Sequence, residues 1–281
     1  MLDRLTFIQT LEFILFEYEY RKLMKERCHL HNILASEYWI FGDQYALGHS
    51  DESLCSLLKS HLHIMGRSEL AAEVEDVTDL YGNPDRRPDL MLYRKSARDT
   101  EGHFEHLVIE LKRPSLKISE EEIRQIEKYA FAVSKDVRFD KAKTKWVFWL
   151  IGDELDDFAQ QKCEQQNRPY GLIDQKPNVD IWVKKWSTVI ADCKWRYHFY
   201  RDVLEKDVTK DESKAFLAEK HSKYVPSPEK LAEELKKHEE KKVKKISKRG
   251  RTKKDKSSEE ESKASEGTET IAVEAADGAS P

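Results

Sequence analysis

The strongest constraint on the fold of this chain is residues 103–112, a strand-like segment in which a short apolar run leads into charged side chains. Residues 107–109 (Leu-Val-Ile) are typical of a buried strand, and Glu110 and Lys112 follow them. Because side chains of a strand alternate between its faces, Glu110 and Lys112 share one face while Leu111 points the other way, into packing. A strand with buried character rarely carries charges without partners, so we expect these two charges to act together.

A second strand-like segment, 89–93, lies upstream and begins with Asp89. Residues 96–102 between the two segments include an aspartate and a glycine, a composition typical of a turn. Two antiparallel strands joined by this turn would bring Asp89 towards Glu110, and their spacing fits strands of roughly eight residues. The sequence therefore predicts a hairpin that carries two neighbouring carboxylates.

Two carboxylates and a lysine in this arrangement suit metal-dependent hydrolysis of a phosphodiester. Magnesium prefers oxygen ligands and commonly takes one or two carboxylates, with waters and substrate phosphates completing its coordination. The bound metal polarises the phosphate and lowers the pKa of an attacking water. Taken alone, a Pro-Asp pair is common in turns and a Glu-x-Lys strand can be an exposed ion pair. The apolar run before Glu110 favours the metal site over those simpler interpretations.

Pro88-Asp89 together with Glu110-Leu111-Lys112 resembles the motif of the PD-(D/E)XK nuclease superfamily. Downstream, Gln125 and Tyr129 lie four residues apart on one face of a predicted helix and look like the QxxxY element of RecB-like members. Residues 38–42 (Tyr-Trp-Ile-Phe-Gly) and 148–152 (Phe-Trp-Leu-Ile-Gly) extend the likeness to the nuclease domain of Shedu-type antiphage defence proteins. This resemblance covers roughly residues 30 to 205.

The resemblance implies an α/β, restriction-endonuclease-like PD-(D/E)XK fold with a mixed central sheet flanked by helices. It implies that Asp89 and Glu110 bind Mg²⁺ or Mn²⁺ and that Lys112 orients or activates the attacking water. Gln125 would then position Lys112 or the scissile phosphate. Many members add an acidic residue from the first core helix, and Glu37 is the candidate here, although a solvated surface glutamate is an equally good interpretation.

Basic residues near the predicted site offer a local surface for nucleic acid, although residues 1–205 carry more acidic than basic side chains. Tyr129 joins this predicted surface through its place beside Gln125, and a half-buried tyrosine on a helix surface is the alternative. The basic candidates are Arg113, Lys117, Arg124 and Lys128.

The chain divides into three predicted segments: an N-terminal amphipathic helix (1–34), the nuclease domain (35–205) and a charged tail (206–281). All six tryptophans precede the tail and supply apolar surface for a core. The N-terminal helix could pack on the nuclease core, on another protomer or on a preceding module. The tail is basic over 236–256 and acidic afterwards, so we expect partial helix and then disorder. The basic residues of the tail could bind DNA phosphates, or the acidic stretch that follows could neutralise their charge.

Several classes of protein are not expected. The cysteines form no CxxC pair, so we expect reduced thiols in a cytoplasm rather than a zinc site; they are Cys28, Cys55, Cys163 and Cys193. No apolar span is long enough to cross a bilayer, and no membrane association is expected. No P-loop glycine pattern is present, so nucleotide hydrolysis would require an ATPase module or a partner protein.

The function expected from these features is metal-dependent hydrolysis of DNA phosphodiester bonds, in antiphage or restriction-like defence. A homo-oligomer is plausible because cutting both strands usually takes two active sites. Two alternatives stay open: a DNA-binding domain that does not cut, and an assembly or regulatory module of a larger defence complex.

Overall fold

A computed structural model of the chain describes residues 2–50, 54–64, 66–71, 88–96, 103–204, 209–224, 233 and 236–237. The chain forms two compact units, Met1–Ser227 and Pro228–Pro281, and the central sheet with its surrounding helices belongs to the first. The predicted turn after residue 96 lies outside the described residues, as does the tail beyond residue 224 apart from residues 233 and 236–237.

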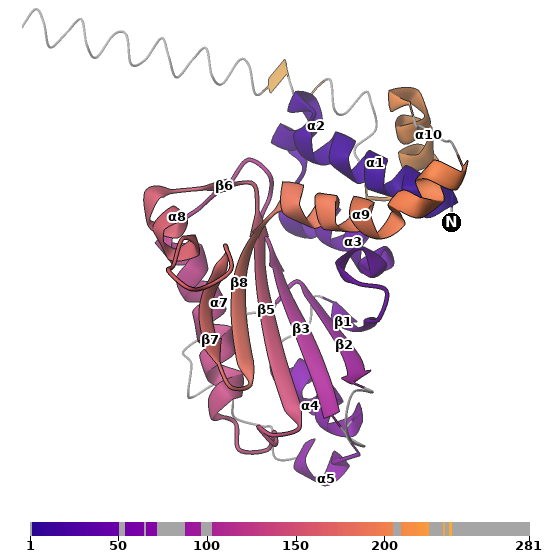
Figure 1. The fold of residues 1–281 in the computed structure, drawn as a ribbon. Coiled ribbons are helices and arrows are strands. Elements are labelled where there is room, and N and C mark those ends of the chain that lie inside the picture. Colours follow the sequence, from indigo (N-terminus) through magenta and orange to yellow (C-terminus); the bar gives the residue numbers. More distant parts are fainter. Residues whose placement is uncertain are drawn as a thin grey trace, which may run out of the picture. The chain divides into compact units, whose positions relative to one another are not determined.

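The centre of the first unit is a mixed six-stranded sheet in the described part of the chain, with strand order β1-β2-β3-β5-β8-β7 (Figure 1). Strands β3, β5 and β8 run parallel, and the other pairings are antiparallel. A separate parallel pair joins β4 (Lys117–Ile118) to β6 (Glu154–Leu155). The sheet strands are β1 (Ala46–Ser50), β2 (Leu90–Ser96), β3 (His103–Leu111), β5 (Thr144–Gly152), β7 (Leu172–Lys176) and β8 (Val179–Lys185). The expected mixed α/β architecture is confirmed.

The predicted pairing of the first two site strands is also confirmed. Strand β2 runs antiparallel to β3, with Leu90 opposite Ile109. Asp89 directly precedes β2 and Glu110 directly follows Ile109, so this register brings the two carboxylates to the same end of the hairpin.

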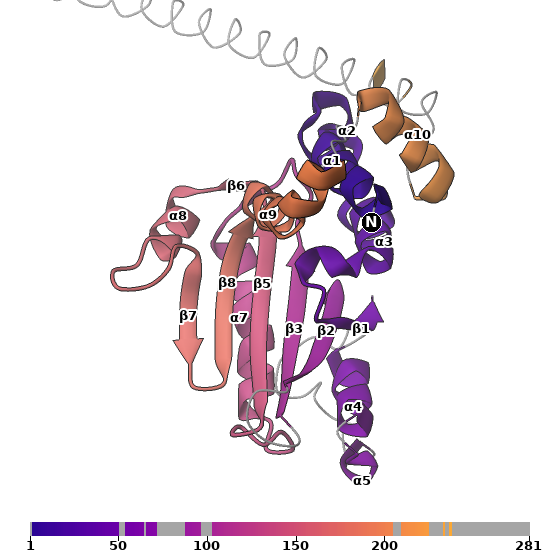
Figure 2. The same ribbon diagram turned by 45° about the vertical axis from the view of Figure 1, so that its right-hand side comes forward.

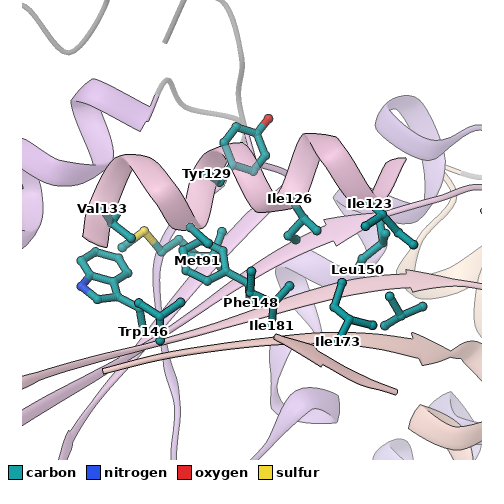
Figure 3. Close-up of a cluster of buried hydrophobic side chains, with 14 of the residues drawn as sticks. Met91, Ile123, Ile126, Tyr129, Val133, Trp146, Phe148, Leu150, Ile173 and Ile181 are labelled. Atoms are coloured by element: carbon teal, nitrogen blue, oxygen red, sulfur yellow. The ribbon is translucent and has the colours of Figure 1, made fainter. Parts of the chain in front are cut away.

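Helix α7 (Glu120–Lys135) covers one face of the sheet. It starts with a capping box, in which Ser119 accepts a hydrogen bond from the backbone of the first turn and Glu122 bonds back to the Ser119 backbone. Its apolar side chains recur at helical spacing and face alternate residues of the strands. Figure 3 shows Ile123, Ile126 and Val133 of α7 facing Met91, Trp146, Phe148, Leu150 and Ile181 of the strands, while the Tyr129 ring projects from the other side of the helix.

The N-terminal and C-terminal helices of the first unit gather beyond the end of the sheet where β8 continues into α9 (Figures 1 and 2). They are α1 (Leu2–Phe16), α2 (Tyr18–Leu23), α3 (His31–Ser36), α9 (Trp186–Leu204) and α10 (Lys210–Lys220), with the π-helix η1 (Glu26–Leu30) and the 3₁₀ helix η2 (Tyr38–Phe41). Helices α4 (Leu54–Ile64), α5 (Ser68–Ala71) and α8 (Asp157–Cys163) complete the described elements.

The single amphipathic helix predicted over residues 1–34 is wrong, because α1 ends at Phe16 and α2, η1 and the start of α3 follow it within this segment. Most apolar side chains of α1 are buried, although Phe16 at its end is exposed, and α1 contacts α9 and α10. The N-terminal helix α1 therefore packs on other helices of its own chain. The compact unit Met1–Ser227 includes both α1 and α10. The predicted segments had divided the chain after residues 34 and 205, which separated these two helices from the nuclease domain. No helix in the described ranges combines the length and apolar character that a membrane span requires.

Candidate metal centre

Separate elements bring charged side chains together at the carboxyl end of β3. Asp89 directly precedes β2, Glu110 is the second-last residue of β3, and Lys112 directly follows β3. Gln125 comes from the first half of α7, and Glu26 is the first residue of η1.

Three carboxylates form the acidic part of this cluster. Glu26, Asp89 and Glu110 each present an oxygen, and these oxygens lie within 4.8 Å of one another. Asp89 and Glu110 are buried, whereas the Glu26 side chain is 25% exposed. Converging carboxylate oxygens are the donors that Mg²⁺ and Mn²⁺ prefer.

Asp89 is held in place by the neighbouring strand. Its Oδ2 accepts a hydrogen bond from the Leu111 backbone N–H at 2.7 Å. Burial and the nearby Glu110 carboxylate raise the pKa of Asp89 well above its usual value, against the lowering effect of the Leu111 bond. A cation bound between the two carboxylates would offset this repulsion.

Glu110 uses one of its two oxygens within the protein. Oε1 accepts hydrogen bonds from Lys112 Nζ at 2.8 Å and from Gln125 Nε2 at 2.7 Å. Oε2 is buried and has no hydrogen-bond partner among the described residues. An unpartnered buried carboxylate oxygen costs free energy, and a metal ion is a partner that would remove this cost. The donor set therefore fits a divalent cation.

Burial raises the pKa of Glu110, and the charge and hydrogen bond of Lys112 oppose that rise. For Lys112, burial disfavours the charged form, but the Glu110, Glu26 and Asp89 carboxylates outweigh it and raise the pKa of the ammonium. Lys112 is therefore a buried cation at neutral pH.

Lys112 is held both at its side-chain ammonium and at its backbone. Its Nζ donates to Gln125 Oε1 at 3.2 Å and lies 4.0 Å from Glu26 Oε1. Its backbone N–H donates to Ile151 O at 2.7 Å, and its carbonyl accepts from Trp186 Nε1 at 3.2 Å. Strand β5 and helix α9 thus hold the backbone from which this ammonium extends.

Gln125 connects the polar cluster to α7. Its Nε2 bonds to Glu110 and lies 3.4 Å from the Tyr129 hydroxyl, so Gln125 and Tyr129 share a helix face as predicted. Tyr129 is only 3% exposed, and its ring projects from the side of α7 opposite Ile123 and Ile126 (Figure 3). It therefore offers little surface to a nucleic acid.

Glu37 lies outside the acidic cluster among the described residues. Its Oε2 accepts from Trp39 Nε1 at 2.6 Å, and its Oε1 lies 3.6 Å from His221 Nε2. The third carboxylate is instead Glu26, which the sequence reasoning missed. Glu26 sits in the charged stretch 21–27, which resembles a solvated helix end, and the π-helix that begins with Glu26 has no simple sequence signal.

The predicted basic side chains Arg113, Lys117, Arg124 and Lys128 are exposed. Arg124 Nη2 lies 2.7 Å from Glu120 Oε1 on the same helix. An open pocket of about 480 Å³ reaches Gln125 along the surface of α7. It is lined by Glu120, Glu121, Arg124, Gln125 and Lys128. The pocket surface thus carries charges of both signs beside the cluster.

Comparisons with family models, curated proteins and solved structures found no match to this chain. The local motif and the geometry of the cluster are therefore the features of this chain that bear on its function.

Proposed function

We propose that this chain is a metal-dependent nuclease of the PD-(D/E)XK fold that hydrolyses DNA phosphodiester bonds with Mg²⁺ or Mn²⁺. The observation that carries the proposal is the cluster of Glu26, Asp89 and Glu110 oxygens within 4.8 Å, with Lys112 Nζ 2.8 Å from Glu110. A purely structural ion pair would need one carboxylate for the lysine, whereas three carboxylates leave negative charge that suits a divalent cation.

The residues would divide the chemistry between them. Glu26, Asp89 and Glu110 would hold the cation, which when bound would polarise the scissile phosphate and lower the pKa of the attacking water. The Lys112 ammonium would orient that water or donate to the phosphate oxygens, where it would offset the negative charge that develops in the transition state. Gln125 would keep Glu110 and Lys112 aligned through its bonds to both.

The preference for DNA and the role in antiphage or restriction-like defence follow from the resemblance to Shedu-type nuclease domains. Exposed Arg113, Lys117, Arg124 and Lys128 would contact backbone phosphates near the metal centre. Cytoplasmic action, self-association for cutting both strands and cooperation with an ATPase module or another partner belong to the same proposal.

The test is cleavage of supercoiled and linear DNA by the purified full-length chain with Mg²⁺, Mn²⁺ or EDTA. We expect cutting with either metal, none with EDTA and none in the Glu110→Gln variant. Equal cutting by wild type and Glu110→Gln would contradict the proposal. DNA binding without cutting under any of these conditions would favour the non-cutting DNA-binding module.

A further inference from the structure

Arg21, in α2, links the N-terminal helices to two chain segments that leave the sheet near the metal centre. Its Nε donates to Pro114 O at 3.3 Å. Its Nη2 lies 2.7 Å from Glu154 Oε1 and 2.9 Å from Asp153 Oδ2. One guanidinium therefore contacts the segment that follows β3 and the segment that follows β5.

The same segments form the immediate surroundings of Lys112. Pro114 lies two residues beyond Lys112, and Asp153 directly follows Gly152, the last residue of β5. The Lys112 N–H bonds to the carbonyl of Ile151 in β5. Arg21 thus docks α2 on the backbone segments that adjoin Lys112.

The chain from Arg21 to Glu26 is short and well packed. Leu23 and Met24 are buried at 6% and 1% exposure, and the Met24 N–H donates to Tyr20 O at 2.8 Å. Glu26 lies five residues after Arg21 and belongs to the acidic cluster. The position of Glu26 therefore depends on how α2 is docked.

Glu26 differs in this respect from the other two acidic residues. Asp89 and Glu110 belong to the β2–β3 hairpin and accept hydrogen bonds at 2.7 to 2.8 Å. Glu26 comes from a separate segment, is one-quarter exposed and lies 4.0 Å from the Lys112 ammonium. It is the carboxylate whose place most needs an external support.

We propose that Arg21 is a positioning residue for the metal centre, which holds Glu26 within reach of the cation by docking α2 on residues 113–114 and 153–154. This inference rests on the proposed metal-dependent function. An exposed ion pair contributes little to stability by itself, but a planar guanidinium with several acceptors fixes geometry. Metal affinity, more than folding, is the property that depends on Arg21.

The test is Mn²⁺ affinity, measured by titration calorimetry without DNA on the full-length chain. Arg21→Gln should raise the dissociation constant about 10-fold, the size expected for loss of a side chain that orients a metal ligand. Arg21→Lys should have a smaller effect, because one ammonium cannot reproduce the fork of donors. In a Glu26→Gln background, Arg21→Gln should change the constant less than about twofold, because the ligand that it positions is already lost.

Lys194→Gln is the matched control. Lys194 Nζ lies 2.6 Å from Glu12 Oε2 and ties α9 to α1, so its loss removes a partly exposed ion pair from the same group of helices, away from Glu26. Lys194→Gln should leave Mn²⁺ affinity unchanged, and melting temperatures of all variants report any general loosening.

Unchanged affinity in Arg21→Gln, or an equal loss in the Glu26→Gln background, would overturn the inference and leave the proposed function intact. A wild-type chain that binds no Mn²⁺ would overturn both. A coupled loss, large with Glu26 and absent without it, is the result that the proposal requires.

Discussion

Lys112 Nζ lies 2.8 Å from Glu110 Oε1, and both side chains are buried. Burying one charge of such a pair without the other is costly, so each residue depends on its neighbour for its ionised form. The second oxygen of Glu110 has no hydrogen-bond partner in the described part of the chain, which leaves it available to a metal ion. This pair is the chemical centre of the proposed site.

Replacing Lys112 should separate metal binding from catalysis. Lys112→Met keeps the length of the side chain and removes its charge. We expect cleavage to fall by about 100-fold to 1,000-fold, the usual cost of losing one donor that stabilises transition-state charge. Mn²⁺ should still bind, because the three carboxylates remain and one competing cation is gone.

Lys145→Met is the comparison for this variant. Lys145 Nζ pairs with Asp180 Oδ2 at 2.6 Å, near the start of β5, while Lys112 bonds to Ile151 near the end of that strand. Its cleavage rate should match wild type. Retention of full activity in Lys112→Met would remove the lysine from the mechanism.

Two glutamates of the N-terminal region can be told apart by metal affinity. Glu26→Gln should weaken Mn²⁺ binding about 10-fold, because it removes one of three converging carboxylates. Glu37→Gln should change the affinity by less than about twofold, because a glutamine can still accept the hydrogen bond from Trp39 and lies outside the cluster. Calorimetry on the two purified variants decides the matter, and the opposite ranking would restore Glu37 as the ligand.

The contrast between these glutamates shows which site residues can be predicted from the sequence. Asp89 and Glu110 were predictable because a hairpin pairs them through local strand alternation and an antiparallel register. Glu26 was not, because its place depends on the tertiary docking of α2 through Arg21, across more than 90 residues of chain to Pro114. The packing of α10 on α1 is equally non-local, since the isolated segment 210–220 has too weak an apolar pattern to predict it.

Truncation should distinguish α10 from the rest of the tail. Removing residues 228–281 leaves the compact unit Met1–Ser227 complete, so folding and metal-dependent cleavage should persist. Removing residues 206–281 also deletes α10, whose Leu217 is buried and which contacts α1. That shorter chain should lose about 2 kcal/mol or more of stability, seen as a lower midpoint in urea unfolding. Equal midpoints for both truncations would show that α10 does not support α1.

Two buried cysteines should resist alkylation in the folded protein. Burial raises the pKa of the Cys163 and Cys193 thiols to about 11. At pH 8 their thiolate fraction should be more than about 100-fold below that of an ordinary thiol, and burial also blocks the reagent. Iodoacetamide labelling followed by peptide mass mapping should find both unmodified in buffer and modified in urea. Rapid labelling of either in buffer would contradict the packing of α8 and α9.

The most direct test of the proposed metal centre is anomalous diffraction from crystals soaked in Mn²⁺. We expect one strong peak about 2.1 Å from carboxylate oxygens of Asp89 and Glu110, with Glu26 on the same ion directly or through water. The Glu110→Gln crystal, treated identically, should show a much weaker peak. Two results would contradict the claim that these three residues form the metal centre. One is a strong peak at other residues, and the other is no peak at this cluster although Mn²⁺ supports cleavage.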